Sequence, residues 1–281
     1  MAEKSFGPAP GPSPTSQAAL GRLESLIASL LDPERGCPWD REQTVDSLTE
    51  DFLEECFELR EAIALGQAEG VLEEGGDVAF LLAFMARLAE KKWSFGFKEM
   101  LDGAVDKMVR RHPHVFDEAA RRLSDSEGVL KQWHQIKREK KASLLGSVPV
   151  AMPALARCHR LSSKAARAGF DWPDPAEVRK AVDLELAELD VEIALGDFKD
   201  PKRRERLRHE LGDALMALAN LARHLGFSAE KALCEANGRF VDRFNLVEGE
   251  LAEKNLKPED VGLAELERLW AKAKKKLEKP T

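Results

Sequence analysis

The sequence predicts an all-α protein built from two tandem copies of one helical module. Tyrosine is absent, β-branched residues are sparse, and residues that favour helices dominate: alanine, leucine, glutamate, lysine and arginine. Segments with helical patterning fill most of the chain and end at glycine or proline. An acidic pattern and several other landmarks occur twice in the same order, which indicates an internal duplication.

The composition limits the classes of partner. The 281 residues suffice for one large domain or two ordinary ones, and a hydrophobic content of 43% supports a core. A net charge of −7 provides no global attraction for nucleic acid or an anionic membrane, so we expect neither as a partner. The longest apolar run, Val78–Ala86, is too short to span a bilayer. The four scattered cysteines fit a reducing compartment, and we expect a cytoplasmic protein.

The first copy is expected to follow a disordered tail. Residues 1–16 are rich in proline, glycine and serine and lack the apolar centre of a secretory signal. The N-terminal module then covers residues 17–144. Its expected helices span 18–31, 47–65, 71–91, 98–111 and 129–141.

The second copy begins after a break rich in glycine and proline at residues 145–149. The C-terminal module is expected to cover residues 150–277. Its expected helices span 153–168, 176–195, 201–225, 228–253 and 263–277.

Five landmarks of the first copy recur in order in the second. Such agreement over about a hundred residues indicates duplication rather than chance. The matched pairs are Gly36–Trp39 with Gly169–Trp172, Glu58 with Glu188, Glu74 with Glu210, Lys107 and Arg111 with Arg239 and Arg243, and Trp133 with Trp270.

Each copy carries two acidic motifs on neighbouring expected helices. Residues three or four apart share a helix face, and a turn at Gly66 or Gly196 lets the two helices run antiparallel, so we expect the acids to converge. The motifs are Glu54-Glu55-x-x-Glu58 with Glu74-x-x-Asp77, and Glu185-x-x-Glu188 with Glu210-x-x-Asp213.

Converging carboxylates point to a divalent cation. Four carboxylates close together repel and raise one another's pKa values unless a cation neutralises them. Ligation by oxygen alone favours Mg²⁺, or Mn²⁺, over zinc. A single acidic cluster on a helix is usually a solvated face, but the partner motif and the second copy argue against that interpretation here. A duplicated site of this kind indicates chemistry on phosphates.

Three motifs resemble the MazG family, and the resemblance covers about residues 18–275. MazG proteins are nucleoside triphosphate pyrophosphohydrolases of the all-α NTP pyrophosphatase group. The resemblance implies two tandem helical-bundle modules of that type, cleavage of an NTP between the α and β phosphates, and a homodimer. The motifs are Gly36-Cys37-Pro38-Trp39-Asp40 with Gln43-Thr44, the paired acidic motifs, and Arg110-Arg111-His112-Pro113-His114-Val115-Phe116.

The resemblance also implies the roles of the acids. We assign metal binding to Glu55, Glu58, Glu74 and Asp77 in the first copy, and to Glu185, Glu188, Glu210 and Asp213 in the second. We assign catalytic roles to Glu54, Glu58 and Glu188. The first glutamate of the motif is Glu54 in one copy but Leu184 in the other, so the second copy is compromised if that residue orients water and intact if it is only a supporting group.

Basic and aromatic residues form the expected nucleotide-binding sets. In the second copy Arg239 and Arg243 share a helix face and can reach a triphosphate, with Asn237 and Arg206 as further candidates and Trp270 to stack on the base. The first copy offers Lys107, Arg111 and Trp133 instead. In two-module members of the resembled family the C-terminal copy is usually credited with the activity.

Five other aromatic or imidazole positions have simpler interpretations. We expect Trp39 and Trp172 to be core anchors rather than covers for a base, and His112 with its neighbour His114 to form a capped helix end. His209 adjoins Glu210, and we expect it to point to a different helix face.

Two other functions compete with the pyrophosphohydrolase. A di-iron bundle needs Glu-x-x-His on two helices, and neither acidic motif contains it. A non-catalytic or partly decayed nucleotide-binding regulatory protein is favoured by Leu184 and by Gly75-Gly76, which loosens the helix at the site. A hybrid, with one active and one regulatory copy, also fits. The sequence does not distinguish the base, the sugar or the active copy.

Overall fold

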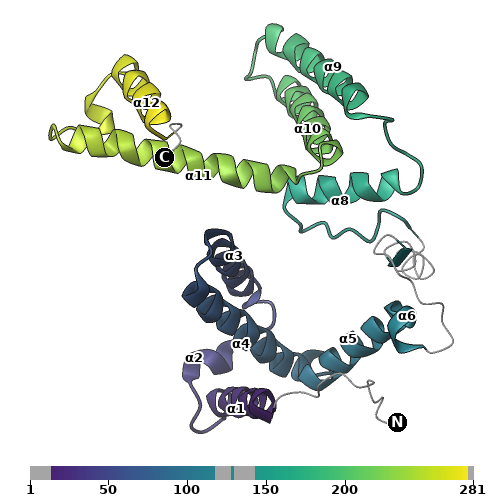
Figure 1. Cartoon of the computed structure of the whole chain (residues 1–281). Helices are drawn as coiled ribbons and strands as arrows, with labels where there is room; N and C mark the ends of the chain where they lie inside the picture. Colours follow the sequence, from purple (N-terminus) through teal and green to yellow (C-terminus); the bar gives the residue numbers. More distant parts are fainter. Residues whose placement is uncertain (1–13, 118–127, 130–142, 278–281) are drawn as a thin grey trace. The chain divides into compact units, whose positions relative to one another are not determined.

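The computed structural model describes residues 14–117, 128–129 and 143–277, and the regular elements within these ranges are all helices (Figure 1). The chain divides into two compact units, residues 1–139 and 140–281. The all-α class predicted from composition and patterning is confirmed.

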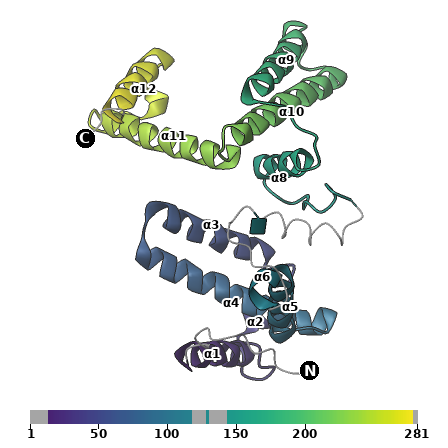
Figure 2. The same ribbon diagram turned by 45° about the vertical axis from the view of Figure 1, so that its right-hand side comes forward.

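The N-terminal unit is organised around a long helical hairpin. Its helices are α1 (Pro14–Leu30), α2 (Pro38–Glu42), α3 (Thr49–Leu65), α4 (Ala68–Trp93), α5 (Phe97–Arg111) and α6 (Pro113–Phe116). Helices α3 and α4 lie side by side and antiparallel (Figures 1 and 2). Gly66 makes the turn between them with a φ of 68°, a left-handed conformation that glycine adopts without steric cost.

The core of this unit lies at one end of the hairpin. It contains Ile27 of α1, Leu48 before α3, and Ala83, Phe84 and Leu88 of α4. These α4 residues occupy the C-terminal half of the helix, whereas Glu74 and Asp77 occupy the N-terminal half. Burial therefore fixes one end of α4 and leaves the acidic end beside α3 with access to solvent.

The C-terminal unit repeats the hairpin. Its elements are α8 (Ala154–Ala166), α9 (Pro175–Ala194), α10 (Pro201–His224), α11 (Ala229–Ala252), the 3₁₀ helix η1 (Pro258–Asp260) and α12 (Leu263–Leu277). Helix α9 pairs with α10, and α12 packs against α11 through Val247, Leu251, Leu269 and Ala273 (Figure 2). The turn between α9 and α10 contains Gly196 with a φ of 66°.

Aspartate caps define where the second hairpin begins and turns. The Asp174 carboxylate accepts hydrogen bonds from the N–H groups of Ala176 (2.8 Å) and Glu177 (2.9 Å), and Pro175 follows at the first helical position. Asp200 accepts a hydrogen bond from Arg203 N–H at 3.1 Å ahead of α10, which also opens with a proline. These caps set the register of the acidic residues further along α9 and α10.

Several expected boundaries need correction. Helix α1 begins at Pro14, so the tail expected over residues 1–16 is wrong for its last three residues. Helix α3 begins at Thr49 rather than residue 47, because Thr44 and Ser47 form a turn in which each backbone N–H donates to the other hydroxyl. The short helix α2 was not predicted, and the helix expected over 129–141 lies outside the described residues except for Val129.

A membrane span is also absent from this part of the chain. No helix within the described ranges combines the length and the apolarity needed to cross a bilayer.

Two leucines on α4 test the position of the core. Leu88 is 6% exposed in the core and Leu72 is 80% exposed on the same helix. Replacing Leu88 with alanine should lower the free energy of unfolding by about 2–5 kcal/mol, because it leaves a cavity. The same change at Leu72 should cost about 0.5 kcal/mol or less. Urea unfolding of the two variants measures both values, and equal costs would contradict this placement of the core.

Candidate metal centres

The N-terminal cluster joins acids from both helices of the α3–α4 hairpin. Glu55, Glu58 and Glu74 each offer a carboxylate oxygen, and these oxygens lie within 4.8 Å of one another. Glu55 and Glu58 are three residues apart and therefore share the face of α3 that meets α4. The predicted convergence of these three acids is present in the structure.

Mutual repulsion and desolvation raise the pKa values of this cluster. For Glu55 the main cause is desolvation, followed by the charges of Asp77 and Glu58. For Glu58 the negative charge of Glu74 is the largest cause of the raised pKa, and desolvation follows. The pKa of Glu74 is raised by desolvation and then by its contact with Glu55. The influence of Asp77 on Glu55 and Glu74 places this fourth acid at the border of the cluster.

The C-terminal cluster has the same construction on α9 and α10. Glu185, Glu188 and Glu210 offer carboxylate oxygens within 4.8 Å of one another. Desolvation raises the pKa of Glu185, and the charges of Asp213, Glu188 and Glu210 add to the effect. Asp213 therefore borders this cluster as Asp77 borders the first.

The donor set of both clusters suits a hard divalent cation. Carboxylates held close together repel one another and are costly to ionise together, and a cation removes that cost. Oxygen ligands supplied by carboxylates are those that Mg²⁺ and Mn²⁺ accept. The residues present fit such an ion.

The two clusters differ at the first position of the motif. The negative charge of Glu54 contributes to the raised pKa values of Glu55 and Glu58, after the larger causes already named, so this exposed acid lies beside the cluster. Leu184 takes the place of Glu54 in the second copy and is 64% exposed. The N-terminal cluster therefore has an additional proton acceptor in contact with solvent.

His209 lies on the acidic face of α10, which corrects the expectation from the sequence. Its ring was expected on a different helix face from the acids, but Nδ1 is 3.2 Å from Asp213 Oδ2 and 3.6 Å from Glu210 Oε1. The i, i+4 spacing to Asp213 brings the ring to the acids. That spacing is visible in the sequence and would have indicated the correct face, whereas the adjacent position of Glu210 does not.

The expected nucleotide-binding residues of the second copy lie on two helix pairs. Trp270 on α12 contacts Phe240 with 5.1 Å between ring centroids, and the guanidinium carbon of Arg243 lies 5.9 Å from the indole centroid. Arg239 and Asn237 are exposed on α11. Arg206 belongs to the α9–α10 hairpin, where its Nε is 3.4 Å from Glu192 Oε2. The structure thus brings Arg243 and Trp270 together. Arg206 lies about one helical turn before Glu210 on α10.

The corresponding residues of the first copy are only partly described. Lys107 and Arg111 are half-buried on α5. Trp133 lies outside the described residues. His112 ends α5, with Nδ1 2.7 Å from the carbonyl oxygen of Met108, which agrees with a hydrogen-bonded helix end.

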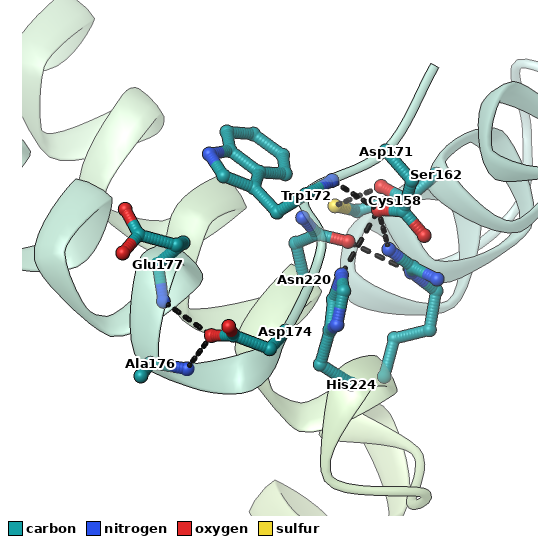
Figure 3. A network of polar contacts seen from close by, with 10 residues as sticks. Cys158, Ser162, Asp171, Trp172, Asp174, Ala176, Glu177, Asn220 and His224 are labelled. Carbon is teal, nitrogen blue, oxygen red and sulfur yellow. Dashed lines mark hydrogen bonds and ion pairs between the residues drawn. The ribbon is translucent and has the colours of Figure 1, made fainter. Parts of the chain in front are cut away.

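The two tryptophans before the acidic helices are not core anchors. Trp39 is 59% exposed and Trp172 is 44% exposed, so that expectation is wrong for both. The turn that carries Trp172 is held instead by polar contacts (Figure 3).

Asp171 is the centre of these contacts. Its Oδ1 accepts hydrogen bonds from Arg223 Nη2, from the His224 ring (2.9 Å) and from the N–H of Trp172 (3.0 Å), and Arg223 Nε also donates to Asn220 Oδ1 (Figure 3). Burial acts to raise the pKa of Asp171, but the hydrogen bonds from Arg223 and His224 outweigh it and lower the pKa. The network fixes the start of α9 to the end of α10. Sequence reasoning missed it because its partners lie about fifty residues apart.

The fold and these clusters define a class of all-α protein in which paired helices present carboxylates for a divalent cation. Comparisons with known proteins specify the class further. Residues 43–116 match the MazG nucleotide pyrophosphohydrolase domain. The Escherichia coli (strain K12) protein named "Nucleoside triphosphate pyrophosphohydrolase" is 37% identical over 261 residues, which cover 91% of this chain and 97% of the relative.

Two further relatives extend the comparison. The Thermotoga maritima protein named "Nucleoside triphosphate pyrophosphohydrolase/pyrophosphatase MazG" is 37% identical over 90% of this chain and 94% of its own length. The "Uncharacterized protein YabN" of Bacillus subtilis is 37% identical over 90% of this chain and 51% of its own length. The chain belongs to the MazG family.

Acidic repulsion makes the stability of the metal-free protein depend on pH. The folded-state pKa values of Glu55, Glu58 and Glu74 lie above their ordinary value of 4.5, so the folded state binds more protons than the unfolded state. Without a cation, the cluster's contribution to stability should therefore fall as pH rises above about 4.5. Added Mg²⁺ should raise the melting temperature more at about pH 8 than at about pH 5, because binding requires ionised carboxylates.

Scanning calorimetry in a chelator and in excess Mg²⁺ measures this difference. A Glu55→Gln, Glu58→Gln variant is the control and should lose part of the Mg²⁺-dependent gain. A gain of equal size at both pH values would contradict a carboxylate centre.

Proposed function

We propose that this chain cleaves nucleoside triphosphates with water to give the nucleoside monophosphate and pyrophosphate. One combination of observations carries the proposal: the chain matches its pyrophosphohydrolase relatives over about nine-tenths of its length and has four acids on each of two helical hairpins. The relatives' names support the substrate class, and the donor set supports Mg²⁺, with Mn²⁺ as the alternative.

The proposed ligands are the clustered acids of each hairpin. When bound, the cation would neutralise charge on the phosphate oxygens and favour ionisation of the attacking water. The ligands would be Glu55, Glu58, Glu74 and Asp77 in the N-terminal unit, and Glu185, Glu188, Glu210 and Asp213 in the C-terminal unit.

The exposure of the acids indicates which of them face an incoming substrate. Glu58 and Glu188 are exposed, whereas their cluster partners Glu55, Glu185 and Glu210 are half-buried. We assign Glu58 and Glu188 to the open side of each cluster, where a triphosphate and a water molecule arrive. Glu54 is exposed beside the N-terminal cluster and can accept a hydrogen bond from that water.

Local positive charge must bring the triphosphate to a protein of net charge −7. We assign this role in the C-terminal unit to Arg206, Arg239 and Arg243, with Asn237 as a neutral hydrogen-bonding group and Trp270 to stack on the base. The contact of Arg243 with the Trp270 ring supports the assignment, because it combines a phosphate-binding group and an aromatic face in one place. Lys107, Arg111 and Trp133 are the candidates of the N-terminal unit.

Exposed apolar side chains support assembly. Both hairpins expose several large apolar residues, and exposed apolar surface is a feature of surfaces that bind other proteins. On α9 and α10 they include Leu184, Val191, Ile193, Leu211, Leu215 and Met216. We propose a homodimer of the 31.2 kDa chain, and light scattering that gives only the monomer mass would refute it.

Matched glutamine substitutions assign the activity to a unit. Glu58→Gln and Glu188→Gln each remove one charged ligand at equivalent positions, and we expect the variant of the active cluster to lose pyrophosphate release by about a hundredfold or more, since a lost ligand should cost at least as much as a lost supporting contact. Equal partial losses would mean that both clusters work.

The reaction itself is tested in the same assay. With Mg²⁺ or Mn²⁺ the unaltered chain should release pyrophosphate rather than orthophosphate from several ribo- and deoxynucleotides. Nucleotide binding without any release would instead favour the regulatory alternative.

Arg239 allows a separate test of nucleotide binding. Its exposed guanidinium should contact phosphate before and during the reaction, so Arg239→Ala should raise KM by about tenfold or more with a smaller effect on kcat. Lys231→Ala is the control, because Lys231 is an exposed base on the same helix that we assign no role. Equal KM values for the two variants would rule out the assigned role of Arg239.

A further inference from the structure

We propose that His209 supplies an imidazole nitrogen to the C-terminal cluster, so that this cluster prefers a first-row transition-metal dication such as Mn²⁺ to Mg²⁺ more strongly than the N-terminal cluster does. The inference rests on the proposed function, because it takes the C-terminal acids to be a metal centre. It adds a ligand that differs in kind from the carboxylates and a difference in metal preference between the two units.

The geometry brings three potential donors of α10 together. His209 and Asp213 are one helical turn apart, with Nδ1 3.2 Å from Asp213 Oδ2, and Glu210 Oε1 lies 3.6 Å from the same nitrogen. One ligand atom from each of the three side chains lies within 4.8 Å of the others. A single helix carries all three, so the three donors come together within α10 alone. An i, i+4 pair on one helix is also the spacing by which paired histidines bind zinc in helical metalloproteases.

Glu210 connects this group with the acids of α9. It belongs both to the set with His209 and Asp213 and to the set with Glu185 and Glu188. The shared Glu210 therefore connects the imidazole with the acids of α9.

The exposure of the ring fits a ligand that is completed by an ion. The His209 side chain is 73% exposed, whereas Glu210 and Asp213 are 20% and 43% exposed. Packing does not hold the ring at this position, and its partners there are the two acids. A cation bound by those two acids would lie beside the ring nitrogen. The exposed ring has space to rotate toward such an ion.

Ligand chemistry then decides the metal preference. Mg²⁺ binds oxygen and gains little from an imidazole, whereas affinity for transition-metal dications increases when nitrogen joins the donor set. The equivalent position in the N-terminal unit is Glu73, which precedes Glu74 as His209 precedes Glu210. The two clusters therefore differ in donor type at one matched position. The N-terminal cluster can serve as the reference for the metal preference of the C-terminal cluster.

The experiment isolates the C-terminal cluster in the full chain. A parent variant with Glu55→Gln and Glu58→Gln removes two ligands of the N-terminal cluster. It is titrated with Mn²⁺ alone and with Mg²⁺ alone, without nucleotide, by calorimetry. Pulsed electron paramagnetic resonance of the Mn²⁺-loaded protein then detects ¹⁴N coupling from a coordinated imidazole. The same measurements are repeated after His209→Ala.

We expect ¹⁴N coupling in the parent and its loss in the His209→Ala variant. Mn²⁺ affinity should fall by about tenfold or more, because removal of a supporting contact alone typically costs that much. Mg²⁺ affinity should change by less than about twofold, since the oxygen ligands remain. As a reciprocal control, Glu73→His in a chain with Glu185→Gln and Glu188→Gln should introduce ¹⁴N coupling at the N-terminal cluster.

The outcomes separate this inference from the proposed function. Mn²⁺ bound to the parent without ¹⁴N coupling would overturn the inference and make His209 an ion-pair partner of Asp213. Unchanged affinities in the His209→Ala variant, or equal losses for both ions, would also overturn it. In each of these cases pyrophosphate release by the unaltered chain would still support the proposed function. A parent that binds neither ion would overturn the inference, and absence of pyrophosphate release from the unaltered chain would overturn the function as well.

Discussion

Repulsion between carboxylates held on packed helices is the constraint on which both units depend. Each hairpin brings acids within a few ångströms of one another, and desolvation together with their like charges raises the pKa values of Glu55, Glu58 and Glu74 in one unit and of Glu185 in the other. Such an arrangement persists only if other contacts hold the helices together, because the acids themselves favour separation.

The hairpins meet this constraint by separating core from site along the helix. In α4 the buried residues Ala83, Phe84 and Leu88 begin about two turns after Asp77, so apolar burial anchors one end while the other end carries the charge. In the second unit Val178 and Val182 of α9 and Ala214, Ala219 and Ala222 of α10 are also buried, and the aspartate caps and the Asp171 network add polar contacts to these helices. Apolar burial therefore supports the acidic geometry in both copies, and the second copy adds polar contacts.

Features that follow from short-range rules could be predicted from the sequence. Glycine and proline mark most helix ends, and the spacing of three residues within each acidic motif places Glu55 with Glu58 and Glu185 with Glu188. The duplication supports the pairing of the two motifs independently, because a chance cluster of acids would not recur in the second copy. These predictions need only helix periodicity and a turn of the right length.

Other features depend on tertiary contacts or on a less obvious spacing. The exposure of Trp39 and Trp172 reflects how the preceding turns pack, which residue type alone does not determine. The Asp171 network joins residues about fifty positions apart, and no local pattern indicates it. His209 differs, because its i, i+4 relation to Asp213 is a local pattern, and only its relation to the adjacent Glu210 favours the wrong face.

The exposure of Leu184 bears on how the two copies evolve. A side chain that is 64% exposed on a helix surface contributes little to packing, so exchange between leucine and glutamate there acts mainly through the charge that it adds beside the cluster. Purifying selection at this position can then act only through the effect of the side chain on the acidic cluster. Tandem duplication lets the two copies carry different residues at this position, and the hairpin can diverge there while its fold is maintained.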